Sequence, residues 1–139
     1  MRPFSTASGI APTEYLASNE GTQFISGTLD DAAVTTVDDN GKKYLDKGVV
    51  LARINSPVAA SGLLGPYSES ASDGRQLDRN IVGINDTFAD LSEGDVEVGV
   101  LVAGSVKESA IVFGSQSGTI QGAYKDKLRI ANVDILFTA

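Results

Sequence analysis

Few side chains in this chain of 139 residues could carry out enzyme chemistry. It contains no His, no Cys and no Trp, and its formal net charge at pH 7 is −7. His and Cys are the usual nucleophiles, proton carriers and metal ligands at neutral pH. Carboxylates, hydroxyls and Lys remain, and they fall in no catalytic spacing. We therefore expect a protein that acts through its surface, with no enzymatic activity, no cofactor and no metal.

The acidic stretch 38–41 invites comparison with a calcium-binding loop. Thr36 stands where the first acidic ligand of such a loop would be, and Lys47 stands where a bidentate Glu is required. The Asn-Gly pair within the stretch is favoured in tight hairpins, because both residues tolerate positive φ. The sequence therefore predicts a hairpin turn here.

Two further polar groups fail as catalytic sites. The Ser-rich stretch 68–73 has no His or suitably spaced Lys that could take a proton from a serine. Glu93, Asp95 and Glu97 could supply a glycosidase pair, but strand alternation places Asp95 and Glu97 on an exposed face. The glycines match neither a dinucleotide-binding motif nor a P-loop, so nucleotide binding has no support.

Composition limits the class of protein. Hydrophobic residues make up 42% and charged residues 21%, which is ordinary for one globular domain. No stretch approaches the roughly 18 apolar residues that span a bilayer, and the first residues lack an apolar signal core, which predicts a cytosolic product and no membrane partner. A net negative chain is repelled by DNA, so we expect no nucleic-acid partner.

The chain divides into an N-terminal arm and one domain. Residues 1–22 carry few charges and only isolated apolar side chains, which predicts an extended arm that is ordered by whatever it lies against. A frayed terminus without a role remains the alternative. We expect residues 23–139 to form a single β-rich domain without internal repeats.

Short β-rich runs separated by polar breaks follow along this domain. We expect strands at 24–25, 33–37, 48–54, 80–84, 96–102 and 133–137. The run 96–102 has the clearest alternation and predicts a half-buried strand with a polar outer face. The Gly/Ser/Pro-rich connection 61–78 is long enough to be functional or pinned by its own side chains. Within it, we expect residues 73–75 to shape a turn.

One segment is ambiguous and one is helical. Residues 105–108 fit a capping box that would open a helical turn, whereas the β-branched and aromatic run 111–113 favours a strand. Tyr124, Leu128 and Ala131 fall at helical spacing, and Asn132 would be a suitable left-handed cap. The sequence thus predicts a mainly β domain with one short helix near the C-terminus.

Five pieces between residues 48 and 113 stand out by their order and spacing: GVVLARI (48–54), LGPY (64–67), ASDGRQ (71–76), IVGI (81–84) and VGVLVAGSV (98–106). In this order and spacing, they resemble the lambda-type head decoration proteins of tailed bacteriophages. They span roughly half of the chain. Each piece is short, and it is their combination that is specific.

The resemblance implies a β-clip-like domain, a small β-barrel or sandwich, that forms homotrimers on an icosahedral capsid. Such proteins are made in the host cytoplasm and bind the outer surface of the expanded head at threefold and quasi-threefold positions. Their partner is the major capsid protein, which they hold against internal DNA pressure. An N-terminal arm often adds a strand to a capsid-protein sheet, and a charge-poor arm with spaced apolar residues suits that mode.

On this basis we expect two groups of residues to contact the capsid. The groups are the arm residues Pro3, Phe4, Ile10, Tyr15 and Leu16 and the loop residues Leu64, Pro66 and Tyr67. For the loop, the alternative is that Leu64 and Tyr67 fill the domain core. A carbohydrate- or receptor-binding module of a fibre or tail is the competing function. The lack of Trp and the few aromatics argue against it, because sugar-binding β-domains usually present exposed aromatic platforms.

Overall fold

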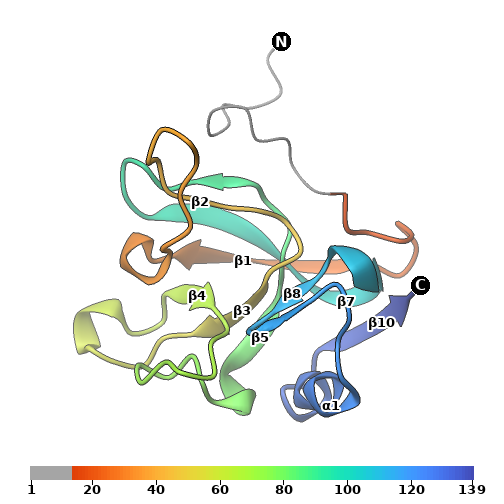
Figure 1. The fold of residues 1–139 in the computed structure, drawn as a ribbon. Helices are drawn as coiled ribbons and strands as arrows, with labels where there is room; N and C mark the ends of the chain where they lie inside the picture. Colours follow the sequence, from red (N-terminus) through yellow and green to blue (C-terminus); the bar gives the residue numbers. More distant parts are fainter. Residues whose placement is uncertain (1–13) are drawn as a thin grey trace.

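A computed structural model describes residues 14–139 as a mainly β domain with one α-helix near the C-terminus (Figure 1). This confirms the fold class expected from the sequence. The principal strands are β1 (Gln23–Leu29), β3 (Val50–Arg53), β4 (Leu64–Pro66), β5 (Ile81–Asn85), β7 (Val96–Lys107) and β10 (Asp134–Thr138). The helix, α1, runs from Gly122 to Ile130.

Five of these strands close into a small barrel. Strand β1 pairs in parallel with β4 at Leu29 and antiparallel with β7 along its whole length. The ring is completed by antiparallel pairs between β4 and β3, β3 and β5, and β5 and β7. Strand β10 lies outside the ring and pairs in parallel with the last residues of β7. Closure hides the hydrogen-bonding edges of the central strands, which is how barrels avoid edge-to-edge association.

Shorter elements cover the barrel. Strand β2 (Tyr44–Leu45) pairs with β6 (Ala89–Asp90), and β8 (Val112–Phe113) pairs with β9 (Gln116–Ser117). Single-turn 3₁₀ helices occur in the connections, at Asp31–Ala33, Val58–Ala60, Asp78–Asn80 and Glu108–Ala110. Figure 1 shows α1 at one end of the domain, beside β10.

Strands β3 and β5 separate two apolar clusters, and this explains their nearly unbroken apolar sequences. In β3, Val50 and Ala52 belong to one cluster and Leu51 to the other. A strand that is buried on both faces shows a continuous apolar run instead of alternation. One cluster takes residues from all five strands of the ring, and the other includes Tyr67, Phe113 and the helix residue Leu128.

Strand β7 confirms the predicted alternation and extends beyond it. Val98 and Val100 are buried, whereas Glu97 is exposed. The strand continues to Lys107 because its last residues pair with a strand of their own. Its residues 96–103 pair with β1, and its residues 103–107 pair with β10.

The ambiguous segment contains both predicted structures in succession. Strand β7 ends at Lys107, the 3₁₀ turn Glu108–Ala110 follows, and β8 contains Phe113. No side chain caps that turn, so the predicted capping box does not form. The Glu108 carboxylate instead accepts a hydrogen bond of 2.8 Å from the backbone N–H of Ile120.

The predicted hairpin turn at 38–41 is confirmed. The Asp38 carboxylate accepts hydrogen bonds from the backbone N–H groups of Asn40 and Lys42, and Gly41 adopts φ +78°. The left-handed cap is confirmed too, because Asn132 follows the helix with φ +62°.

The prediction of a strand at 33–37 is wrong. The Asp30 side chain accepts from the N–H of Ala32 and caps a 3₁₀ turn at Asp31–Ala33, and only Val37 forms an isolated bridge. Local capping by an Asp side chain outweighed the β propensity of the run that follows.

Candidate interaction surface

Tyr15 belongs to the core of the domain. Its side chain is 1% exposed, and its hydroxyl donates a 2.5 Å hydrogen bond to Oδ1 of Asp86. Burial, together with this bond and the negative charge of Asp86, raises the pKa of Tyr15 well above its ordinary value. Tyr15 is therefore a structural anchor, and its side chain does not face a partner.

The backbone around Tyr15 joins the sheet as well. Lys107 donates from its N–H to the Tyr15 carbonyl at 2.8 Å, and Ala17 donates to the Ser105 carbonyl at 3.0 Å. Leu16 forms an antiparallel bridge with Val106 and packs, half-buried, against the core. Residues 15–17 belong to the segment expected to be an extended arm, and what they lie against is β7 of the same domain. Pro3, Phe4 and Ile10 lie outside the described residues.

The loop residues expected to contact a partner are also mostly internal. Leu64 and Tyr67 are both buried, and the Tyr67 ring packs edge-on against Phe113 with a centroid distance of 5.2 Å. The sequence left open the alternative that Leu64 and Tyr67 fill the domain core, and the structure shows this alternative. Pro66 is half-buried, and its carbonyl accepts a hydrogen bond from Arg75.

The long connection 61–78 is pinned by its own side chains, which is one of the two alternatives that the sequence offered. Arg75 donates from Nε to both carboxylate oxygens of Asp73, at 3.1 and 3.0 Å. The Asp73 carbonyl accepts from the N–H groups of Asn55 and Ser56. Residues 73–75 thus shape a turn, as expected, although the same connection also contributes β4 to the barrel.

Other apolar side chains are the ones that face solvent. On β1, Phe24 is 46% exposed and Ile25 is 47% exposed, while on β10 Leu136 is 64% exposed. Ile130, the last residue of α1, is exposed too. The exposure of Leu136 could have been found from the alternation within 133–137. This alternation places Leu136 and Asp134 on the face opposite Ile135 and Phe137. Exposed apolar side chains on strands with one unpaired edge are a feature of association surfaces.

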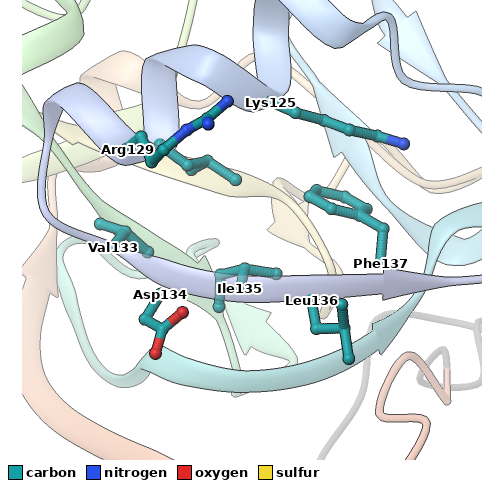
Figure 2. A pocket seen from close by; sticks show the side chains of 8 residues that line it. Lys125, Arg129, Val133, Asp134, Ile135, Leu136 and Phe137 are labelled. Carbon is teal, nitrogen blue, oxygen red and sulfur yellow. The ribbon is translucent and has the colours of Figure 1, made fainter.

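A groove runs between α1 and β10, with a volume of about 410 Å³. Its lining residues are Lys125, Leu128, Arg129, Val133, Asp134, Ile135, Leu136 and Phe137. In Figure 2, Phe137 points toward the helix, whereas Asp134 and Leu136 project from the opposite side of the strand. The Lys125 ammonium lies 5.0 Å from the centre of the Phe137 ring, within cation–π range. The groove therefore combines an apolar floor with Asp134 and with two helix cations. Lys125 is paired with Glu108, and Arg129 is paired with Asp126.

Polar contacts fix α1 on the barrel. Glu69 accepts hydrogen bonds from the Tyr124 hydroxyl and from both the backbone N–H and the hydroxyl of Ser115. Partial burial by itself would raise the pKa of Glu69, but these hydrogen bonds outweigh it and lower the pKa to about 2. Lys127 is held 3.0 Å from Asp78, and this bond raises the pKa of Lys127.

Three carboxylates gather at one end of the barrel. Asp30, Asp31 and Asp95 each place an oxygen within 4.8 Å of the others. Asp30 caps the turn that follows it, and Asp95 accepts from the backbone N–H of Asp31 at 2.9 Å. Turn formation accounts for the positions of these two side chains.

Among residues 14–139, no helix has the length and apolar character needed to cross a membrane. No protein-family model matches the sequence, and no significant match was found among curated proteins.

Proposed function

We propose that this protein is a capsid decoration protein that binds the outer surface of an expanded tailed-phage head. In this proposal it assembles as trimers at threefold and quasi-threefold positions and holds neighbouring major capsid subunits together. The observation that carries the proposal is a barrel with exposed apolar side chains on two strands that each have an unpaired edge, Phe24 and Ile25 on β1 and Leu136 on β10. Such edges bind other chains through main-chain hydrogen bonds.

Charge agrees with an external position on the shell. The chain carries a formal charge of −7, and a negative surface is repelled by packaged DNA. On the outside of the head this charge instead keeps the free protein soluble.

The anchored Tyr15 suggests how an arm could transmit force to the domain. Residues 1–13 precede it, and Tyr15 is held by burial, by Asp86 and by the backbone of β7. A pull on the arm would therefore be resisted by the barrel core. In a trimer, three such arms reinforce one another, since the first engaged arm raises the effective concentration of the others.

Binding to undecorated heads tests this function. Purified protein mixed with expanded, undecorated heads should bind saturably, and electron microscopy should locate it at threefold positions. Deletion of residues 2–13 should leave the domain folded, because Tyr15 remains, but should weaken attachment to the shell. Equal attachment by the truncated and the complete chain would contradict the role of the arm.

A matched variant distinguishes the contribution of the arm to head binding from that of the Tyr15 hydroxyl. Tyr15→Phe keeps the arm and removes only the hydroxyl that binds Asp86. It should bind heads nearly as well as the unaltered chain at temperatures where both are folded. Absence of head binding combined with retention on a glycan column would favour the receptor-binding alternative instead.

A further inference from the structure

Residues 122–138, which contain α1 and β10, form a C-terminal layer outside the closed ring (Figure 1). Strand β10 pairs with residues 103–107 of β7, beyond the part of β7 that belongs to the ring. Among the described residues, the apolar cluster inside the ring takes no buried side chain from beyond Val100. The interior of the ring is therefore complete without the C-terminal layer.

Few buried apolar side chains hold the C-terminal layer in place. Of the nine described residues of α1, Leu128 is the one that is fully buried. None of the five described side chains of β10 is fully buried, and between the two elements Val133 is buried. Isolated helices shorter than about 12 residues are marginal in water. Helix α1 therefore depends on its contacts with the rest of the domain.

Two carboxylates outside the layer contact the helix and its start. Glu69 accepts a hydrogen bond from the Tyr124 hydroxyl. Glu108 accepts from the backbone N–H of Ile120 at 2.8 Å and from the Lys125 ammonium at 3.2 Å. These two bonds lower the pKa of Glu108. Partial burial alone would raise the pKa of Glu69, but its hydrogen bonds outweigh burial and lower the pKa to about 2.

Other charged groups face α1 as well. Asp78 accepts from the Lys127 ammonium at 3.0 Å. Arg129 pairs with Asp126 inside the helix, so this pair can persist when the helix moves as a unit. The other titratable or charged side chains on the elements around the helix are Tyr67, Arg79 and Asp134. Protonation of Glu69 and Glu108 would thus leave the Lys125 ammonium without its carboxylate partner.

We propose that the C-terminal layer opens as one local unit while the barrel stays closed, and that Glu69 and Glu108 are the acid-sensitive contacts that keep it closed. Opening uncovers the rings of Tyr67 and Phe113, which contact Lys127 and Tyr124 of the helix, and the edge of β7 at 103–107. The layer is thus a movable cover over an apolar face of the barrel.

The direction of the acid effect follows from the ionised form of the two carboxylates. A carboxylate with a lowered pKa stabilises the closed state while it is ionised. For Glu69 this contribution is complete above pH 4.5 and is lost as the pH falls toward 2. Carboxylates whose contacts persist in the open state, such as Asp86 with Tyr15, do not alter this local equilibrium.

Hydrogen exchange of the complete chain, followed by ¹⁵N NMR at neutral pH, tests separate opening. After correction for intrinsic rates, the amides of α1 and β10 should exchange together, at least about tenfold faster than the amides that join β3 to β5. Equal protection of the two groups would indicate one cooperative unit and would overturn the proposal. No capsid is needed, so failure to bind heads would count against the proposed function alone.

Variants in the two apolar clusters provide a matched comparison. Val98→Ala shortens a buried side chain inside the ring, which stays folded whether the layer is closed or open. It should therefore lower the protection of the β3 and β5 amides and leave that of α1 unchanged. Leu128→Ala should lower the protection of both groups, because global unfolding also releases α1. An equal loss in both groups for Val98→Ala would contradict separate opening.

Neutral variants test the two closing contacts. Glu69→Gln combined with Glu108→Gln should lower the protection of the α1 amides severalfold at neutral pH and should reduce its further loss in acid. Glu93→Gln combined with Glu97→Gln is the control. Both of these positions are exposed, and the cations of α1 pair with other carboxylates. The same acid response of α1 in the unaltered chain and in the Glu69/Glu108 variant would rule out their role.

Discussion

The connection 64–67 and the strand β10 carry similar apolar residues but use them differently. Leu64 and Tyr67 are buried, and the backbone N–H of Tyr67 donates to the Val50 carbonyl at 2.8 Å. Leu136 lies on a strand with one partner, and its side chain faces solvent. The comparison teaches that residue type does not distinguish a buried position from an exposed one here. An apolar side chain is buried where other segments pack over its strand, and it is exposed where none do.

Truncation of a core aromatic should have the largest effect on stability. Tyr67→Ala removes the ring that packs against Phe113 and should lower the free energy of unfolding by about 3–5 kcal/mol. Urea denaturation followed by circular dichroism measures this change. A loss below about 1 kcal/mol would mean that Tyr67 is not a core residue and would remove the contrast with β10.

Removal of the anchoring hydroxyl should have an intermediate effect. Tyr15→Phe leaves the ring in the core but deprives Asp86 of its donor, which should cost about 1–2 kcal/mol in unfolding free energy. Tyr44→Phe is a suitable control, because Tyr44 is only half-buried and stacks on Phe88. Equal losses in the two variants would show that the Asp86 bond contributes no specific stabilisation.

Acid should weaken the attachment of α1 through Glu69. The folded-state pKa of Glu69 is about 2, below its ordinary value of 4.5, so its stabilising contribution is present above pH 4.5. That contribution is lost as the pH falls from about 4.5 toward 2. Thermal unfolding across this range should show a smaller acid-induced drop in Tm for Glu69→Gln than for the unaltered chain.

The exposure of Glu69 makes this effect modest, because solvent screens its interactions. Glu93→Gln, at another exposed position, provides the control and should retain the acid-induced drop of the unaltered chain. If both variants behave alike, the contacts of Glu69 with Tyr124 and Ser115 do not stabilise the domain.

Substitution at the free edges should have the smallest effect on stability. Leu136→Thr and Phe24→Thr should each change the unfolding free energy of the isolated chain by no more than about 0.5 kcal/mol, because these side chains are largely or half exposed. Denaturation at low protein concentration, where copies are separate, measures this value. A loss of several kcal/mol would place these residues in the core and reverse the comparison.

Periodicity accounted for the parts of the fold in which local signals agreed. The alternation within 96–102, the Asn-Gly turn at 38–41 and the spacing of Tyr124 and Leu128 each produced the predicted element. Periodicity gave the wrong prediction at 33–37, where an Asp cap competes with strand propensity. It gave no signal for β4, which is three residues long and depends on pairing with β1 and β3.

By itself, the sequence determined the strand-rich class, the C-terminal helix and the acidic charge, because periodicity, turn chemistry and composition are local properties. Only the tertiary structure decided that Tyr15, Leu64 and Tyr67 are internal and that Phe24 and Leu136 are exposed. Burial depends on which segments distant in sequence pack over a strand. Closure of the barrel covers Leu64, and Tyr15 and Tyr67 are covered in the second cluster, with Phe113 of β8 and Leu128 of α1. Among the described residues, no further strand pairs with the outer edge of β10 or with the second edge of β1 before Leu29.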